Sequence, residues 1–510
     1  MVEAAGTPLK VDSHRTNNWF VLVVLCLCIF ISRLYSFHET LERDITTYAV
    51  IGHELLKGRN LYSDIWDNKP PAAFVTFALA ELIAGYGPNA VFLINVLGAV
   101  LVLFGVYVVG ATGLGDKRAG LWAAAFWMVI SGNLALQANQ PNTELMINAC
   151  LIWAFALLLR ADGDSGLGRF VLMGALLALA SLYKITAIIP AVFLSGVYFL
   201  WPPPRVARWK NALPQMLILA VTCAFIWLLV MIYFSSTGRL NLFWETMVTV
   251  NQYLSGSVLE NIRGGLTLNG IIPSFMIAVF PLYGLTILGM IYGAVKADRA
   301  WIFLMVFLIS SILHALLPGW IMNHYYQLLL PALAVGGGWV IGQLYHLKWR
   351  NSTKIAGYAG LLIFALLLGR QLPNYFIPLS EWPALKYGYH ISELFTSAER
   401  LGQGLAQQVD PRETIYEYGF ETGIYYSSKI SPSSAMFYIN PTFINSPIGE
   451  KMIERIVNDL ERNPPKVFIY QSDLRVHPAV IGWINQKHCY HSASRKKGQG
   501  PFRLLVRVDK

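Results

Sequence analysis

Apolar runs of about 20 residues recur along most of this chain, and each is long enough to cross a bilayer as a helix. They begin after residue 18 and are separated by short polar segments. The composition agrees, because 55% of the 510 residues are apolar. Only 13% are charged, against about 25% in an ordinary soluble domain. The sequence therefore predicts an α-helical polytopic membrane protein and excludes a cytosolic enzyme.

We expect eleven transmembrane helices, placed from the apolar runs and the charges that flank them. They lie near residues 19–37, 89–112, 119–137, 143–160, 169–184, 186–201, 213–234, 271–293, 300–318, 326–346 and 354–370. Residues 72–86 are also apolar but too short for a comfortable crossing, so we interpret them as an interfacial helix. An alternative with thirteen helices stays open, in which this segment and a second short one both cross.

The basic residues predict the orientation of these helices. Alternate loops hold 14 Lys and Arg residues, and the loop at 202–210 contains three of them and no acidic residue. Because basic loops stay on the cytoplasmic side, we expect the N-terminus to be cytoplasmic. The first loop (38–88) and the tail after residue 370 then face the outside, which is the periplasm or the extracellular space in a bacterium and an organelle lumen in a eukaryote.

A boundary near residue 370 divides the chain into two predicted domains. Residues 371–510 carry 29 of the 68 charged side chains, although they are little more than a quarter of the chain. Segments 414–418, 466–470 and 503–508 have the apolar patterns of strands, and residues 450–460 form an amphipathic helical pattern. We therefore predict a membrane domain at 1–370 and an extracytoplasmic α/β domain at 371–510.

Ionisable residues gather at the predicted outer face of the membrane domain. In the first outer loop, Asp44 and Tyr48 recur at helical spacing, which indicates a short amphipathic helix. Four other ionisable residues lie in this loop or at the outer ends of spans: Lys69, Glu144, Lys184 and His324. Charges at membrane depth are costly unless they line a cavity or are paired. Since five separate segments bring such groups to one face, we predict a functional site there.

The residue types in this predicted site indicate its chemistry. A carboxylate can act as a general base toward a hydroxyl group. Lysine, histidine and tyrosine side chains can hold a phosphate and stabilise the charge that develops as it leaves. A site of this kind at the outer membrane face suits a lipid-linked phosphate whose tail stays in the bilayer.

The first outer loop resembles that of the C-type glycosyltransferases. The similarity lies in residues 42–49 (ERDITTYA) and 61–71 (LYSDIWDNKPP), and in the Gly85-Tyr86-Gly87 turn. The most similar branches are the protein O-mannosyltransferases and the bacterial transferases that add aminoarabinose to lipid A. The resemblance extends over roughly residues 19–346 and implies the fold of this superfamily.

The resemblance also implies roles for individual residues. Asp44 takes the position of the catalytic base, and Lys69 belongs to a Lys-Pro-Pro segment that helps to form the donor site. Further residues expected to bind the donor or its phosphate are Lys184, His324, Tyr325, Tyr326 and Arg263, the last of which would close over the site from loop 235–270. Supporting residues expected in the first and second outer loops are Arg43, Tyr48, Asp67 and Glu144.

The implied activity is transfer of a sugar, with inversion, from a polyprenyl-phosphate donor to a hydroxyl group of a lipid, glycan or protein acceptor. The resemblance favours a bacterial inner membrane, and no nucleic-acid partner is expected. The alternative from another functional class is a transporter or flippase for a lipid-linked sugar that uses the same polar cavity. Such proteins usually contain paired repeats, and none is evident here.

The sequence requires no cofactor, and metal dependence stays open. The aminoarabinose branch carries an acidic residue, implicated in metal binding, directly before the lysine of the Lys-Pro-Pro segment. Here Asn68 occupies that position, although Asp67 precedes it. A further difference is Ile45, which follows Asp44 where many relatives have a glutamate. We therefore do not carry a divalent metal over from the resemblance.

Overall fold

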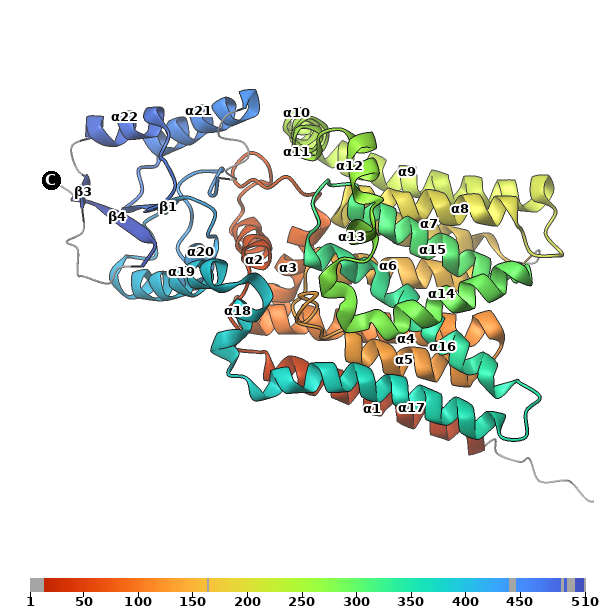
Figure 1. The fold of residues 1–510 in the computed structure, drawn as a ribbon. Helices are drawn as coiled ribbons and strands as arrows, with labels where there is room; N and C mark the ends of the chain where they lie inside the picture. The colour runs from red at the N-terminus through yellow and green to blue at the C-terminus, as the bar shows by residue number, and fades with distance from the viewer. Residues whose placement is uncertain (1–12, 163–164, 440–445, 488–489, 493–499, 509–510) are drawn as a thin grey trace, which may run out of the picture.

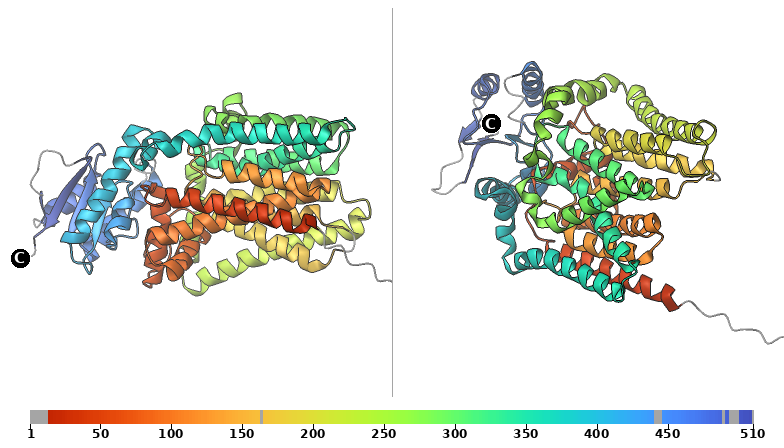
Figure 2. Two further views of the ribbon diagram at one scale, coloured as in Figure 1. Left: turned by 90° about the horizontal axis from the view of Figure 1, so that it is seen from below. Right: turned by 45° about the vertical axis from the view of Figure 1, so that its right-hand side comes forward.

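The computed structural model describes residues 13–162, 165–439, 446–487, 490–492 and 500–508. These residues form a bundle of long helices and a smaller domain that contains a β-sheet (Figure 1). Figure 2 shows this outer domain at one end of the bundle. The protein therefore has the helical membrane part and the C-terminal α/β part that the sequence predicts.

The bundle contains a helix at each of the eleven predicted spans. These helices are α1 (Ser13–Tyr35), α4 (Pro88–Leu114), α5 (Lys117–Ile130), α6 (Thr143–Leu159), α7 (Leu167–Tyr183), α8 (Ile188–Leu200), α9 (Leu213–Ser236), α14 (Phe280–Val295), α15 (Arg299–Leu316), α16 (Leu330–Tyr345) and α17 (Ser352–Gln371). Among the described residues, 7 helical stretches are long and apolar enough to cross a membrane. The protein is therefore an integral membrane protein, while the exact number of crossings stays a prediction.

Small residues allow α5 and α16 to pack closely in the centre of the bundle. A Cβ atom added to Gly338 of α16 would lie 2.5 Å from the backbone oxygen of Ala119 and 2.7 Å from the Cβ of Ala123. Helices in lipid associate through such close backbone contact rather than through the hydrophobic effect. The glycines of α16 thus allow this packing.

Two shorter helices, α2 (Arg43–Leu56) and α3 (Ala72–Ala84), lie between the bundle and the outer domain (Figure 1). They approach closely at Gly52, where an added Cβ atom would lie 2.8 Å from the backbone nitrogen of Ala78. The apolar side chains exposed on α3 recur at helical spacing: Val75, Leu79, Leu82 and Ile83. Such a stripe suits contact with lipid and fits the interfacial helix that the sequence predicts.

The segment between α9 and α14 contains only short helices. They are α10 (Leu240–Trp244), a π-helical segment at Glu245–Val250, α11 (Asn251–Ser255), α12 (Val258–Gly265) and α13 (Leu268–Ile271). A 3₁₀ segment at Asn323–Leu329 precedes α16 and carries the predicted residues His324, Tyr325 and Tyr326.

The outer domain contains a four-stranded sheet in the order β1-β2-β4-β3. Strands β1 and β2 are parallel, whereas β4 runs antiparallel to both β2 and β3. The elements are α18 (Trp382–Tyr387), α19 (Tyr389–Gln408), β1 (Ile415–Tyr418), α20 (Gly423–Ser428), α21 (Pro447–Arg462), β2 (Val467–Gln471), α22 (Pro478–Lys487), β3 (Tyr490–Ser492) and β4 (Phe502–Arg507).

Polar contacts attach the outer domain to α2 and to the loop that follows it. Arg43 forms an ion pair with Glu421 at 2.8 Å, and its guanidinium lies 4.4 Å from the ring centroid of Phe420. The hydroxyl groups of Thr46 and Thr422 lie 2.7 Å apart. The first outer loop is therefore held from both sides, by the bundle and by the outer domain.

Candidate active site

The first turn of α2 presents Asp44 to a partly open space. Glu42 stands at the N-cap of this helix, and a carboxylate in the first turn is favoured by the helix dipole. The side chain of Asp44 remains 31% exposed. One turn later, the buried Tyr48 donates a hydrogen bond from its hydroxyl group to Oδ2 of Asp44 at 3.4 Å. Asp44 is thus fixed in place but remains accessible.

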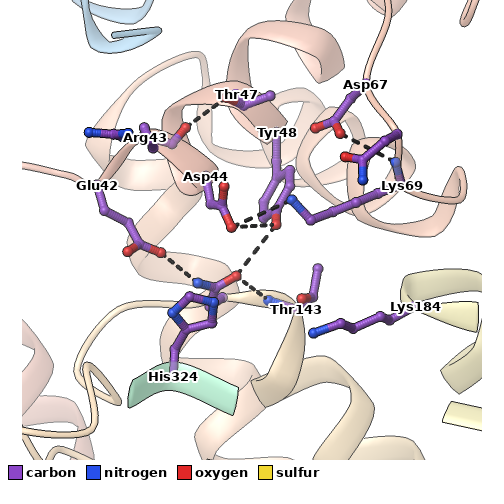
Figure 3. Close-up of polar contacts among 12 residues, drawn as sticks. Glu42, Arg43, Asp44, Thr47, Tyr48, Asp67, Lys69, Thr143, Lys184 and His324 are labelled. Atoms are coloured by element: carbon purple, nitrogen blue, oxygen red, sulfur yellow. Dashed lines mark hydrogen bonds and ion pairs between the residues drawn. The ribbon is translucent and has the colours of Figure 1, made fainter. Parts of the chain in front are cut away.

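Lys69 reaches Asp44 from the loop between α2 and α3 (Figure 3). Its Nζ lies 3.5 Å from Oδ2 of Asp44 and 4.8 Å from the ring centroid of Tyr48. Tyr62 holds the loop, because its hydroxyl group donates to the carbonyl oxygen of Lys69 at 2.8 Å. The backbone of Tyr62 has φ 70°, a left-handed conformation that permits the tight turn.

The charges of this pair stabilise each other. Burial disfavours the ionised form of Asp44, but the charges of Lys69, His324 and Arg43 outweigh it and hold the pKa of the carboxyl below its ordinary value. Burial also disfavours the charged form of Lys69, yet Asp44 and its neighbours raise the pKa of the ammonium well above its usual range. At neutral pH the two side chains therefore form an ion pair.

A buried network of hydrogen bonds lies next to Asp44 and joins Glu42, Tyr48 and Asn142. Asn142 caps α6 by accepting a hydrogen bond from the backbone N–H of Thr143 at 2.9 Å. Its amide donates to Oε1 of Glu42 at 2.5 Å, and its oxygen accepts from Tyr48 at 3.5 Å. Burial raises the pKa of Glu42 despite the opposing charges of His324 and Lys386. Glu42 and Asp44 are therefore two nearby carboxyl groups whose pKa values shift in opposite directions.

A second lysine–carboxylate pair lies across from Asp44. Nζ of Lys184, directly after α7, lies 3.1 Å from Oε1 of Glu144, whose side chain is buried. The same ammonium lies 3.5 Å from the ring centroid of Tyr325. Nδ1 of His324 lies 3.1 Å from the side-chain oxygen of Gln137. Figure 3 shows His324 on the side of Glu42 and Lys184 on the opposite side, below Lys69.

Four other predicted residues do not join this cluster directly. Tyr326 is buried, and its hydroxyl group donates to the backbone oxygen of Gly270. Arg263 is exposed on α12, and no ion pair or hydrogen bond joins its side chain to the part of the chain that the structure describes. Arg43 contacts the outer domain, while Asp67 is buried behind Lys69 and accepts from its backbone N–H at 3.3 Å.

Several residues that hold the cluster are not among the predicted site residues. Asn142 is indicated by its position before α6, where Asn is a preferred helix cap, but nothing in the sequence identifies Glu42 as its partner. No sequence pattern identifies Tyr62 or Tyr438 as a residue of the site. Tyr438 comes from the outer domain, where burial and the nearby Asp67 raise the pKa of its phenol well above its usual value.

The described residues do not fit a metal site. Among them, no group of three or more His, Cys, Asp and Glu side chains is placed to bind an ion. The side-chain amide of Asn68 donates to the side-chain oxygen of Asn251 at 3.3 Å, and the backbone carbonyl oxygen of Asn68 accepts from the side-chain amide of Asn251 at 2.9 Å. Asn68 is therefore held by an amide partner, and we derive no step through a metal.

Comparisons with known proteins agree with this architecture. Residues 68–234 match the family described as dolichyl-phosphate-mannose-protein mannosyltransferase. No curated protein matches the chain.

Solved structures share its fold over almost its whole length. ArnT from Cupriavidus metallidurans in the apo state aligns with a TM-score of 0.60 at 15% identity, covering 97% of this chain and 99% of that one. ArnT bound to undecaprenyl phosphate gives 0.57 at 15% identity, covering 96% and 98%. The archaeal oligosaccharyltransferase AglB from Archaeoglobus fulgidus, in complex with an inhibitory peptide and a dolichol-phosphate, gives 0.55 at 14% identity, covering 97% and 74%.

The chain therefore has the C-type glycosyltransferase fold. The family match within residues 68–234 and the shared fold together confirm the resemblance that the first outer loop indicates. The matched family and these structural neighbours are glycosyltransferases, and one neighbour holds undecaprenyl phosphate.

Proposed function

We propose that this protein transfers a sugar, with inversion, from a polyprenyl-phosphate donor to a hydroxyl group of a lipid, glycan or protein acceptor. The observation that carries this proposal is the accessible pair of Asp44 and Lys69, whose charged atoms lie 3.5 Å apart. It stands where the bundle meets the outer domain, in the loop that resembles the catalytic loop of the family. A base and a phosphate-binding cation are thus adjacent.

Asp44 is the general base in this proposal. Its lowered pKa keeps the carboxylate ionised at neutral pH, so it can accept the proton of the acceptor hydroxyl group. The hydroxyl oxygen then forms a bond to the anomeric carbon as the bond from that carbon to the phosphate oxygen breaks. The polyprenyl phosphate leaves with the bonding electron pair, and attack from the opposite face inverts the anomeric carbon.

Lys69 and Lys184 stabilise the leaving phosphate in this proposal. Each is paired with a carboxylate, and a bound phosphate would compete for its ammonium group. As Lys69 turned toward the phosphate, the pKa of Asp44 would rise toward its ordinary value, because its nearest cation would be shared. Donor binding would therefore strengthen the base. His324 and Tyr325 complete the proposed phosphate site, with Tyr48 and Glu144 as supporting residues.

We further propose that the site faces the outside of the membrane, with a cytoplasmic N-terminus and the outer domain in the periplasm. The support is the distribution of basic residues among the loops. The outer domain contacts the first outer loop, so both belong on the same side. The similarity of the first loop to bacterial members favours a bacterial inner membrane.

Release of polyprenyl phosphate tests the proposed function. Purified protein in nanodiscs is incubated with a panel of polyprenyl-phosphate sugars, with a membrane extract as the source of acceptor. We expect release that requires both the extract and Asp44, and the active donor identifies the sugar. The control is Asp410→Asn, which alters an exposed carboxylate of the outer domain.

The same purified protein, reconstituted into lipid vesicles, distinguishes transfer from transport. A flippase would move a fluorescent lipid-linked sugar between leaflets of a vesicle without releasing polyprenyl phosphate. Translocation by wild type and by Asp44→Asn, with no release for any donor, would contradict the transferase proposal.

A further inference from the structure

The loop between α2 and α3 contains a tight turn whose backbone oxygens are bound from other segments. Tyr62 stands in this turn with φ 70°, and its backbone N–H donates to the carbonyl oxygen of Ile65 at 2.7 Å. The carbonyl oxygens of Leu61, Tyr62 and Ser63 are left for partners outside the turn. Because a carbonyl group that is removed from water needs a donor, the position of this turn depends on the side chains that supply one.

Two arginines supply these donors, one from the bundle and one from the outer domain. Arg239, directly before α10, donates from Nη1 to the carbonyl oxygen of Leu61 at 3.0 Å. Arg455 of α21 donates from Nη2 to the carbonyl oxygen of Tyr62 at 2.9 Å and to that of Ser63. Figure 1 shows the loop beside both α21 and α10. Hydrogen bonds from a charged donor are stronger than neutral ones, so the two arginines hold the turn firmly.

Tyr62 connects this turn to the candidate active site. Its side chain is fully buried, with ring centroids 5.3 Å from Phe234 and 5.9 Å from Phe243. Its hydroxyl group donates to the backbone oxygen of Lys69 at 2.8 Å, and Nζ of Lys69 lies 3.5 Å from Oδ2 of Asp44. One residue is thus bound by Arg455 at its backbone and holds Lys69 with its side chain. A movement of the turn would therefore move Lys69 relative to Asp44.

A second contact of the outer domain lies between Tyr62 and Lys69 in the sequence. The backbone N–H of Trp66 donates to the carbonyl oxygen of Ala435 at 3.1 Å. Ala435 contributes through its backbone, which any residue at that position would supply. Arg455 contributes through its side chain, so a substitution of Arg455 can test what the outer domain does to this loop.

We infer that Arg455 is a positioning residue for phosphate binding, which fixes the turn at 61–63 and thereby holds Lys69 beside Asp44. The inference rests on the proposed function, in which Lys69 binds the phosphate of the donor. Arg455 acts through Tyr62 and Lys69 rather than by contact with the phosphate. The outer domain then takes part in donor binding, although Asp44 and Lys69 belong to the first outer loop.

Binding of undecaprenyl phosphate to the full-length protein, measured by native mass spectrometry from detergent, tests this inference without requiring transfer. Arg455→Met keeps the length of the side chain and removes its donors. We expect the affinity to fall about 3–10-fold, the size typical of residues that act on a site without contacting the ligand. Arg455→Lys, which keeps a charged donor, should recover most of it. Arg462→Met, on the exposed side of α21, should leave the affinity unchanged.

A double-mutant cycle shows whether Arg455 acts through Lys69. Lys69→Gln should weaken binding about tenfold by loss of a charged partner. Adding Arg455→Met to that variant should weaken binding by less than about twofold further, because residues that act through one another are not additive. Tyr62→Phe removes the hydroxyl group that holds Lys69 and should reproduce the effect of Arg455→Met, even if the latter variant fails to fold.

Three outcomes would overturn the inference. Wild-type affinity in Arg455→Met or in Tyr62→Phe, with Lys69→Gln still weakened, would reject the positioning role and leave the proposed function intact. An equal loss from Arg455→Met with and without Lys69 would mean that Arg455 does not act through Lys69. Wild-type affinity in Lys69→Gln would reject the phosphate-binding role of Lys69 in the proposed function, and the inference with it.

Discussion

Two lysine–carboxylate pairs lie near the contact between the bundle and the outer domain, and they differ in distance and in exposure to solvent. Lys386 and Glu39 lie 2.6 Å apart, and both side chains are fully buried. Lys69 and Asp44 lie 3.5 Å apart, with 21% and 31% of their side chains exposed. The buried pair joins α18 to the turn after α1, whereas the open pair joins two parts of one loop.

The difference indicates what each pair can do. A buried ion that loses its partner is left uncompensated at low dielectric, so Lys386 and Glu39 hold the outer domain against the bundle. Asn139 strengthens this contact by donating to Glu39 and accepting from Lys386. An open pair costs less to separate, and its lysine can exchange a carboxylate for a phosphate. Loss of one partner should therefore affect stability most in the first pair, whereas the proposed chemistry depends on the second.

Asp44→Asn should have the largest effect, and it should act on activity alone. A positioned general base typically contributes about 10²–10⁴-fold, so we expect polyprenyl phosphate release to fall by that factor. The amide keeps the shape of the side chain, and the site is partly open to solvent, so the melting temperature should stay within a few degrees of wild type. A variant that retained more than a tenth of wild-type release would show that Asp44 is not the base.

Lys386→Met should act on stability instead. Removal of one partner of a buried pair costs about 3–5 kcal/mol, so the unfolding free energy in nanodiscs should fall by that amount. Limited proteolysis should also cut faster between the bundle and the outer domain.

The matched control for this variant is Lys451→Met. Its pair with Glu245 is 3.6 Å long, with side chains 75% and 44% exposed, so its loss should cost less than about 1 kcal/mol. Replacing both buried partners, as Glu39→Leu/Lys386→Met, should recover most of the stability. Equal effects of the Lys386 and Lys451 variants would show that the buried pair does not anchor the domain.

Lys69→Gln should shift the pH dependence of transfer. Lys69 lowers the pKa of Asp44, so its removal raises that pKa, and the base becomes ionised only at higher pH. The acid limb of the kcat/KM profile should therefore move to higher pH, with activity reduced about 10–100-fold as the phosphate also loses a cation. Lys57→Gln, which alters a lysine paired with Glu54 on the same loop, should leave the limb in place. If the acid limb did not move in the Lys69 variant, Lys69 would not be the residue that lowers the pKa of Asp44.

More of the fold than of the site could be predicted from the sequence. Apolar runs and basic loops predict the helices and their orientation. The thickness of the bilayer sets the length of each span, and cytoplasmic loops are enriched in Lys and Arg. The strands at 414–418, 466–470 and 503–508 follow from their apolar patterns, and β1, β2 and β4 occupy them. The sequence could not predict which side chain each aromatic or acidic residue contacts.

Residues near the site show why. Tyr325 and Tyr326 are neighbours in sequence, yet one ring lies under Lys184 and the other hydroxyl group bonds to Gly270. Glu42 meets Asn142 and Tyr387, which follow it by 100 and 345 residues. These contacts depend on packing between distant helices, so no local pattern encodes them. The catalytic roles of the clustered residues stay predictions that the variants above test.

Glu417→Gln should give the smallest effect, and it extends the comparison to a buried carboxyl group that forms no ion pair among the described residues, although the charge of Arg43 acts on it. Glu417 lies on β1, fully buried, and burial together with Glu421 raises its pKa well above the ordinary value. The folded protein therefore holds this proton to a higher pH than the unfolded chain does. This proton therefore stabilises the folded protein at low pH, and that stability is lost as pH rises from the ordinary pKa of a glutamate through the raised pKa.

The variant removes this titration. Glu417→Gln should raise the unfolding free energy at pH 8 by about 1–3 kcal/mol and flatten its change between pH 8 and pH 5. Unfolding of the full-length protein at each pH, with the exposed Glu454→Gln as control, measures both effects. A wild type whose stability fell as pH was lowered over this range, and a Gln variant with the same slope, would show that Glu417 does not hold its proton to a higher pH in the folded protein.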